Sequence, residues 1–159
     1  MERKIEFRGK SKKDNEWHYG SLFIDDNYGG GYDYYIEYML YGSLPYRHSE
    51  IVIGESVGQY TSFKDANGKK IYEGDIVKFN NQIGEICFEC GSFGIGIKDC
   101  VDYETLEAYI GERFYGCLND NFISLWEIYW NLNCVDYEID EIEVIGNIYE
   151  NKELIEKSS

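Results

Sequence analysis

The chain has 159 residues and a formal net charge of −15, from 15 Lys and Arg against 30 Asp and Glu. This length fits one packed domain, or one domain with an appended subunit, without a need for metal or disulfide cross-links. The acidic excess disfavours general DNA or RNA binding because it repels phosphate backbones, and it leaves basic protein surfaces as natural partners.

The composition favours a mainly β protein. It includes 16 Tyr, 17 Gly and a single Pro, which suits short strands joined by tight turns. No apolar run approaches the roughly 18 residues that span a bilayer, and the charged N-terminus lacks the apolar core of a secretion signal. Five cysteines without such a signal predict free thiols in the bacterial cytoplasm.

The charge is unevenly distributed along the sequence. Residues 99–159 carry fifteen acids and three bases, whereas residues 1–98 carry fifteen acids and twelve bases. Six of these bases fall within residues 1–13: Arg3, Lys4, Arg8, Lys10, Lys12 and Lys13. The second half is therefore a candidate acidic surface, and the first thirteen residues are a candidate basic segment.

The N-terminal third predicts a hairpin followed by a tyrosine-rich strand. Residues 4–10 and 16–24 alternate apolar and polar side chains, and residues 25–31, with three consecutive glycines, predict a flexible loop. Residues 32–41 predict a strand, and the pattern breaks over residues 42–50. A strand buries only alternate positions on one face, so some of its tyrosines must face a second layer, a groove or another subunit. The candidate interface residues are Tyr32, Tyr34, Tyr35, Tyr38 and Tyr41.

The central region predicts tight turns between short strands. Asn67-Gly68 suits the positive φ angles of a tight turn, and Glu73-Gly74-Asp75 predicts a turn in which the Asp75 side chain accepts hydrogen bonds from backbone amides. Strands are expected over residues 76–79, 83–90 and 92–98. Short strands at this spacing are typical of a small barrel.

The C-terminal third mixes helix and strand. Leucine and isoleucine recur at three- and four-residue steps in residues 102–113 and 122–132, which predicts two short helices, the second opening at Ser124. Residues 142–149 alternate as a strand, and residues 152–159 predict a polar, frayed tail.

Three segments carry a resemblance to a known family. They are KIEFRGKSKKDNEWHYG at 4–20, VGQYTSFKDANGKKIYEGDIVK at 57–78 and EIEVIGNIYEN at 141–151. Together and in this order they resemble the YopX-like family of phage and prophage proteins. The resemblance implies an N-terminal β hairpin subunit over residues 1–54, an SH3-like barrel over 55–151, and self-association; it implies no assigned activity. The signature residues are Tyr60, Asp65, Asn67, Gly68, Ile71, Tyr72, Gly74, Asp75, Gly146, Asn147 and Tyr149.

The cysteines and histidines do not form a recognisable metal or redox motif. Cys87 and Cys90 are the one close pair, and in a strand they would point to opposite faces unless a turn intervenes. A zinc site needs four ligands, usually in close pairs, whereas the other cysteines stand singly and both histidines lie far upstream. Cys87 and Cys90 are thus weak metal candidates, free thiols are favoured, and no metal or cofactor is expected.

No motif for catalysis is present. No nucleophile lies at motif spacing from a histidine, and His18, between Trp17 and Tyr19, is expected to face solvent. The pair of carboxylates at Glu73 and Asp75 fits a structural turn better than an acid–base pair, because acids are abundant throughout the chain. The chain is therefore expected not to be an enzyme.

The expected function is that of a phage or prophage accessory protein that binds a host or phage protein and associates with itself, with no membrane partner and with nucleic acid disfavoured as a ligand. Two alternatives stay open. The acidic half could imitate nucleic acid and occupy a DNA-binding protein, or the basic residues 1–13 could bind nucleic acid weakly.

Overall fold

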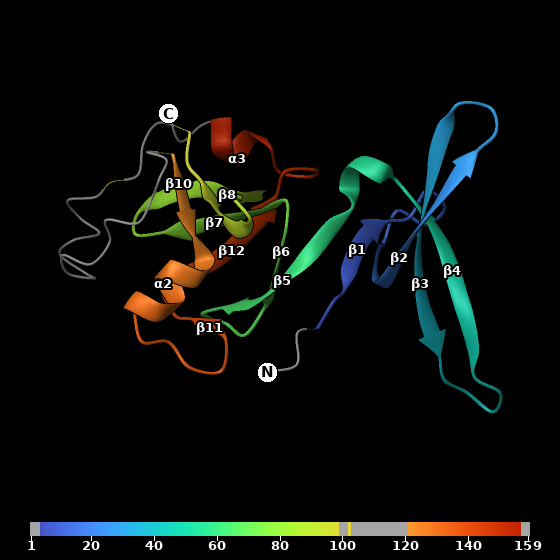
Figure 1. The fold of residues 1–159 in the computed structure, drawn as a ribbon, viewed down its shortest axis with the longest axis horizontal. Coiled ribbons are helices and arrows are strands. Elements are labelled where there is room, and N and C mark those ends of the chain that lie inside the picture. The colour runs from blue at the N-terminus through green and yellow to red at the C-terminus, as the bar shows by residue number, and fades with distance from the viewer. Residues whose placement is uncertain (1–3, 99–101, 103–120, 157–159) are drawn as a thin grey trace. The chain divides into compact units, whose positions relative to one another are not determined.

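The computed structural model describes residues 4–98, 102 and 121–156. The chain divides into two compact units, residues 1–60 and 61–159, and strand β5 (Gly58–Asp65) runs through the boundary. In the described ranges the protein is mainly β, with two short α-helices (Figure 1), which confirms the predicted class.

The N-terminal unit is an antiparallel sheet with two projecting hairpins. Strand β1 pairs with β2, β2 with β3 and β3 with β4, and β1 also pairs with the start of β5. Figure 1 shows the β2–β3 and β3–β4 hairpins extending in opposite directions. The bounds are β1 Phe7–Lys10, β2 Trp17–Asn27, β3 Gly31–Leu40 and β4 Tyr46–Val52, followed by the 3-10 turn η1, Gly54–Ser56.

A small core forms where these strands cross. Ile36 and Val52 are fully buried. A side chain at Gly9 would lie 2.8 Å from Val52 Cγ2, so glycine lets β1 approach β4 closely. The end of β4 returns to β1 through the Ser11–Val52 bridge and through the Ile53 N–H, which donates to the Lys10 carbonyl at 2.8 Å. The base of the two hairpins is thereby fixed.

Two predictions for this unit were wrong. The expected loop over residues 25–31 is strand except for the turn at 28–30, and the expected break over 42–50 ends at Tyr46, where β4 begins. Outside the crossing point neither face of these hairpins is covered, so their side chains need not alternate between apolar and polar. The sequence pattern therefore gave no strand signal there.

The C-terminal unit contains an open five-stranded sheet in the order β10-β9-β8-β7-β12, all antiparallel. Beside it, β5 pairs with β6 and, in parallel, with β11. No pairing among the described residues closes the five strands, so the SH3-like barrel is not confirmed. The bounds are β6 Lys70–Tyr72, β7 Asp75–Phe79, β8 Gln82–Glu89, β9 Ser92–Gly96, β10 Phe122–Ser124, β11 Glu138–Ile139 and β12 Ile142–Asn147.

An apolar core lies between this sheet and a short helix. It is built largely from fully buried aliphatic side chains of the sheet, including Val77, Ile86 and Ile142. Helix α2 (Leu125–Asn131) adds Leu125 and Ile128 to this core. It confirms a helix within residues 122–132, but the prediction was wrong for residues 122–124, which form strand β10. Ser124 is the N-cap residue, but its side chain makes no capping hydrogen bond.

Two further predictions concern helices. The expected helix over 102–113 lies outside the described residues except for Asp102. Helix α3 (Glu153–Glu156) lies in the segment that was expected to be a frayed tail, so that expectation was wrong for these four residues. No helix in the described part of the chain is both long enough and apolar enough to cross a membrane.

Candidate interaction surface

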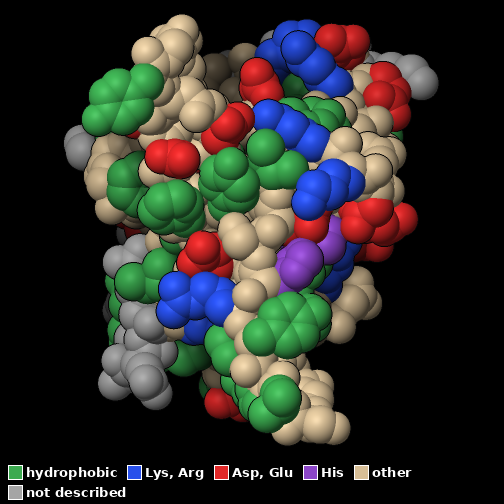
Figure 2. Space-filling view, turned by 90° about the vertical axis from the view of Figure 1, so that its right-hand side faces the viewer, with side chains coloured by type: hydrophobic (Ala, Val, Ile, Leu, Met, Phe, Trp, Pro, Cys, Tyr) green, Lys and Arg blue, Asp and Glu red, His purple; other side chains and the backbone are tan. Residues whose placement is uncertain are grey.

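Exposed apolar side chains are concentrated in the N-terminal unit. Sixteen large hydrophobic side chains are exposed among the described residues, and eleven of them lie between Ile5 and Tyr46. Figure 2 shows apolar side chains at the surface over this unit, interspersed with charged ones. Large exposed apolar patches on a folded protein mark interaction sites. The eleven are Ile5, Tyr19, Phe23, Ile24, Tyr28, Tyr32, Met39, Leu40, Tyr41, Leu44 and Tyr46.

The two hairpins present these side chains on both of their faces. The pairings Phe23–Tyr35 and Tyr35–Ile51 place these three residues on one face, because directly opposed residues share a face. The pairings of Ile24 with Tyr34 and of Leu40 with Tyr46 place those residues on the other face. The side chains nearest the hairpin ends are thus exposed whichever face they occupy.

A groove of about 740 Å³ opens on the face that carries Tyr19 and Met39. It lies where β2 changes partner, since β2 pairs with β1 up to Gly20 and with β3 from Ser21 onward. Apolar lining comes from Ile5, Tyr19, Met39 and Tyr41. Two ion pairs flank it: Lys4 Nζ to Glu6 Oε2 at 2.7 Å, and Arg47 Nη1 to Glu37 Oε2 at 3.6 Å. A groove lined by both apolar side chains and charges of both signs suits a protein segment as ligand.

The opposite face carries a hydrogen-bonded polar cluster. His18 Nδ1 lies 3.0 Å from the Tyr38 hydroxyl, and His18 Nε2 lies 3.2 Å from Asp14 Oδ2. His48 Nε2 lies 2.9 Å from Glu50 Oε2, and the Ser11 hydroxyl donates to Glu50 Oε1 at 2.7 Å. The Tyr38 ring lies between the two histidine rings, with centroids 5.8 and 5.1 Å away. Only 16% of the His18 side chain is exposed, so the expectation that it faces solvent was wrong.

This environment shifts the pKa values of two of its members. Burial by itself raises the pKa of Glu50, but the hydrogen bonds from His48 and Ser11, with the charges of Lys13 and His18, bring it below its ordinary value. Burial raises the pKa of Tyr38, and the negative charge of Glu50 adds to that shift. The cluster therefore holds an ionised carboxylate beside a neutral phenol, an arrangement that stabilises the base of the hairpins.

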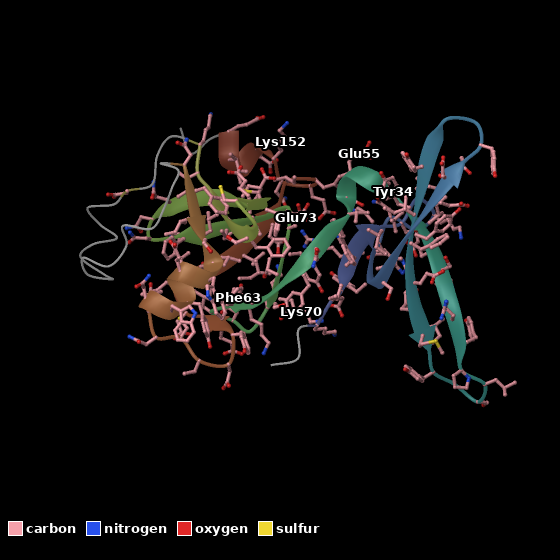
Figure 3. The ribbon with its side chains drawn as sticks, viewed as in Figure 1. Tyr34, Glu55, Phe63, Lys70, Glu73 and Lys152 are labelled. Carbon is pink, nitrogen blue, oxygen red and sulfur yellow. The ribbon has the colours of Figure 1, made fainter. Side chains whose placement is uncertain are left out.

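The five candidate interface tyrosines divide into two groups. Tyr34, Tyr35 and Tyr38 are half-buried within the unit. The ring of Tyr34 (Figure 3) occupies the space beside Gly54, where a Cβ would lie 2.7 Å from its Cε2. Tyr32 and Tyr41 are exposed, Tyr41 by 84%. Tyr32 and Tyr41 are thus the members available to a partner in this conformation.

Several signature residues form buried turns in the C-terminal unit. The Asp65 carboxylate, 1% exposed, accepts hydrogen bonds from the backbone N–H groups of Asn67, Lys69 and Val144 at 2.9, 2.9 and 3.0 Å. The Asp75 carboxylate accepts from the Tyr72 N–H at 2.7 Å, which confirms the predicted turn. These side chains hold the turns of the unit together.

The remaining signature residues have comparable roles. Gly68 and Gly74 adopt φ angles of +74° and +80°, which favour glycine. Asn147 Oδ1 accepts from the N–H groups of Tyr149 and Glu150, and a side chain at Gly146 would lie 2.7 Å from Asn151 Oδ1. Tyr60, Ile71 and Tyr72 are buried, and Tyr149 is exposed.

The two closely spaced cysteines lie in the β8–β9 hairpin. Cys90 is exposed at a φ of +50° and, with Gly91, forms the turn between β8 and β9. Cys87 is half-buried on β8, where burial and the charges of Glu89 and Glu85 raise its pKa to about 11. Among the described residues there is no group of three or more His, Cys, Asp or Glu side chains placed to hold a metal ion.

Sequence reasoning missed the groove and the histidine pairings. Ile5, Met39 and Arg47 belong to three different segments, and no local pattern joins them. The one usable sequence signal was the run of three apolar residues, Met39-Leu40-Tyr41, before the proline-containing turn. Three apolar residues in a row cannot all face one core, and all three are exposed.

Comparison with known proteins identifies the family of this chain. The chain resembles the crystal structure of protein EF1440 from Enterococcus faecalis, with 22% identity and a TM-score of 0.46 over 95% of this chain and 97% of that one. It also resembles the crystal structure of protein yopX from Bacillus subtilis, with 17% identity and a TM-score of 0.43 over 94% and 95%. No curated protein matches. The family model described as YopX protein matches residues 6–156, and the chain therefore belongs to the YopX family.

Proposed function

We propose that this protein is a phage or prophage accessory protein that acts by binding proteins in the host cytoplasm and that associates with itself through its N-terminal unit. The observation that carries the proposal is that, of the sixteen large apolar side chains exposed in the described part of the chain, eleven lie in that unit. Burial of such side chains against a partner is the main driving force of protein association.

The distribution of charge supports a second copy as the occupant of this surface. Residues 1–60 contain seven bases and ten acids, a net of −3, whereas residues 61–159 contain eight bases and twenty acids, a net of −12. Two copies that meet through their N-terminal units bring together surfaces with little net repulsion. Contacts between the two C-terminal units would oppose much larger like charges.

Open strand edges give the same surface a second means of association. In the described residues, β4 is paired along its length only with β3, and its other edge is paired only at Val52. Strand β2 from Ser21 to Asn27 likewise pairs only with β3. Unpaired edges are templates for pairing with another chain. Apolar side chains and free edges therefore coincide on the two hairpins.

Sedimentation velocity of the full chain over a hundredfold range of concentration tests the proposal. The informative variant is Tyr41→Glu/Leu44→Glu, since these side chains are 84% and 86% exposed and can change without disturbing the fold. The matched control is Phe88→Glu/Val135→Glu, which adds the same charge to exposed apolar positions of the C-terminal unit.

We expect the wild type and the control to form a discrete oligomer and the hairpin variant to shift to the monomer. A wild type that remains monomeric at all concentrations contradicts self-association. An oligomer that the control variant breaks and the hairpin variant does not would place the interface on the other unit.

A further inference from the structure

Helix α2 exposes two tryptophans that its role in the core does not require. Leu125 and Ile128 face the core and are fully buried, whereas Trp126 and Trp130 are 42% and 61% exposed. Their spacing of four residues places both on one side of the helix. Two neighbouring exposed tryptophans on a seven-residue helix form an apolar patch of the kind that marks a binding surface.

The tryptophans belong to an ordered set of rings that we call the aromatic platform: Phe63, Trp126, Tyr129, Trp130 and Tyr137. Trp126, Tyr129 and Tyr137 form a nearly parallel series, with interplanar angles of 18° and 6° and centroid distances of 5.8 and 5.6 Å. Trp130 stands edge-on to Trp126 and Tyr129, at 85° and 77°. The platform therefore presents ring faces in two directions.

Three separate segments hold the platform together. Phe63 of β5 (Figure 3) lies 5.4 Å from Tyr129 and 6.2 Å from Tyr137, measured between ring centroids. Tyr137 adopts a φ of +60°, and its carbonyl accepts a hydrogen bond from the Lys64 N–H at 2.8 Å. A bulky side chain in this backbone region is uncommon and is kept there only by its surroundings. The rings are thus positioned before any ligand arrives.

The charge around the platform is negative. Residues 122–151 contain seven acids and no lysine or arginine. Of these acids, Glu127 lies on α2 between the two tryptophans, and Asp136 and Glu138 flank Tyr137. The Lys64 ammonium group is in an ion pair with the Glu138 carboxylate at 3.2 Å. The segment that carries four of the five rings is therefore acidic, which favours a cationic ligand.

From this combination we infer that the aromatic platform binds a basic, extended segment of a partner protein, with an arginine or lysine side chain of that segment lying over the face of Trp126 or Trp130. Aromatic ring faces attract guanidinium and ammonium groups, tryptophan most strongly. The carboxylates of Glu127 and Asp136 complement the remaining positive charge of the segment. This site is separate from the surface proposed for self-association.

Charge decides against the other ligand that aromatic platforms commonly take. Single-stranded nucleic acid also stacks on exposed rings, but such sites combine the rings with a basic track along the phosphates. Residues 122–151, which carry four of the five rings, instead contain acids and no lysine or arginine. A neutral carbohydrate would stack on the rings but would gain nothing from the charge of the carboxylates. Binding of a carbohydrate is therefore one outcome that the test distinguishes.

The test uses the full chain and a peptide probe of alternating arginine and glycine, eight residues long, at physiological salt. The comparison probe is the same peptide with citrulline in place of arginine, which keeps the shape and removes the charge. Binding is followed by isothermal titration calorimetry and by tryptophan fluorescence. The variants are Trp130→Ala, Trp126→Ala and, as a control in the same unit, Phe88→Ala, whose aromatic side chain is 53% exposed.

We expect the arginine peptide to bind and the citrulline peptide not to bind. Neither tryptophan variant changes the net charge. Trp126→Ala or Trp130→Ala, whichever removes the contacted ring, should weaken binding about tenfold because a desolvated cation–π contact is lost. Phe88→Ala should bind like the wild type. If Trp126→Ala and Trp130→Ala both bind the arginine peptide as tightly as the wild type does, only the bulk negative charge acts, and the inference is overturned. Binding of oligosaccharides or single-stranded DNA in preference to the peptide would overturn it as well.

Discussion

The carboxylate of Asp65 accepts a hydrogen bond from the backbone N–H of Val144, which lies 79 residues further along the chain, at 3.0 Å. The same side chain closes the turn between β5 and β6 through the N–H groups of Asn67 and Lys69. One buried carboxylate thus joins a local turn to strand β12. Residues 57–78 and 141–151, both part of the family resemblance, are connected by this contact.

Replacement of Asp65 by alanine should therefore destabilise the C-terminal unit strongly. Three backbone N–H groups lose their acceptor, and hydrogen bonds to a charged group contribute about 1.5–3 kcal/mol each. We expect the free energy of unfolding, measured by urea denaturation, to fall by about 3 kcal/mol or more. The control is Asp140→Ala, on an exposed residue nearby. A loss below about 1 kcal/mol would show that water replaces the carboxylate.

A substitution at Gly20 tests how closely strands β2 and β3 approach each other in the N-terminal unit. A Cβ at this position would clash with the backbone carbonyl oxygen of Glu37 and lie 3.2 Å from Tyr38 Cβ. Gly20→Ala should destabilise the unit by about 1–3 kcal/mol, as other overpacked positions do. Gly42→Ala is the matched control, since nothing lies within 4 Å of a Cβ there. Equal melting temperatures for the two variants would contradict the close approach of β2 and β3.

The lowered pKa of Glu50 predicts that the stability of the folded protein depends on pH. Its folded-state pKa lies below the ordinary value of 4.5, because the hydrogen bonds from His48 and Ser11 outweigh the effect of burial. The carboxylate therefore contributes stability that is present above about pH 4.5 and is lost as pH falls through the folded-state pKa.

The measurement compares the wild type with Glu50→Gln by urea denaturation between pH 6 and pH 3. The wild type should be the more stable at pH 6, and the difference between the two proteins should shrink toward pH 3. Glu143→Gln, on an exposed residue, controls for the loss of a negative charge. A difference between wild type and Glu50→Gln that does not change with pH would contradict the account of this cluster.

The cysteines should differ in reactivity. Cys87 has a pKa of about 11 through burial and the nearby charges of Glu89 and Glu85, so little of it is thiolate at neutral pH. Cys90 is exposed in the β8–β9 turn. At pH 7.5 iodoacetamide should modify Cys90 at least about tenfold faster than Cys87, as followed by mass spectrometry of the digested protein. Equal rates would mean that β8 opens readily.

Local interactions could be predicted from the sequence, and distant ones could not. The turns at Asn67-Gly68 and Asp75 depend on residues within a few positions, and both were predicted. His18 was misplaced because Tyr38, the residue that buries it, lies 20 residues away and no pattern links the two. The hairpin ends were missed because strands with both faces exposed have no apolar alternation. The pairing of β12 with β7 joins segments that only the fold brings together.

The most direct test of the central claim is hydrogen–deuterium exchange of the full chain at two concentrations, one below and one above that at which it associates. If association uses the N-terminal unit, amide exchange at the higher concentration slows in peptides from residues 19–49 and stays unchanged in peptides from residues 122–151. Slowing confined to residues 122–151, or no slowing in any peptide of an oligomeric sample, would contradict self-association through the N-terminal hairpins.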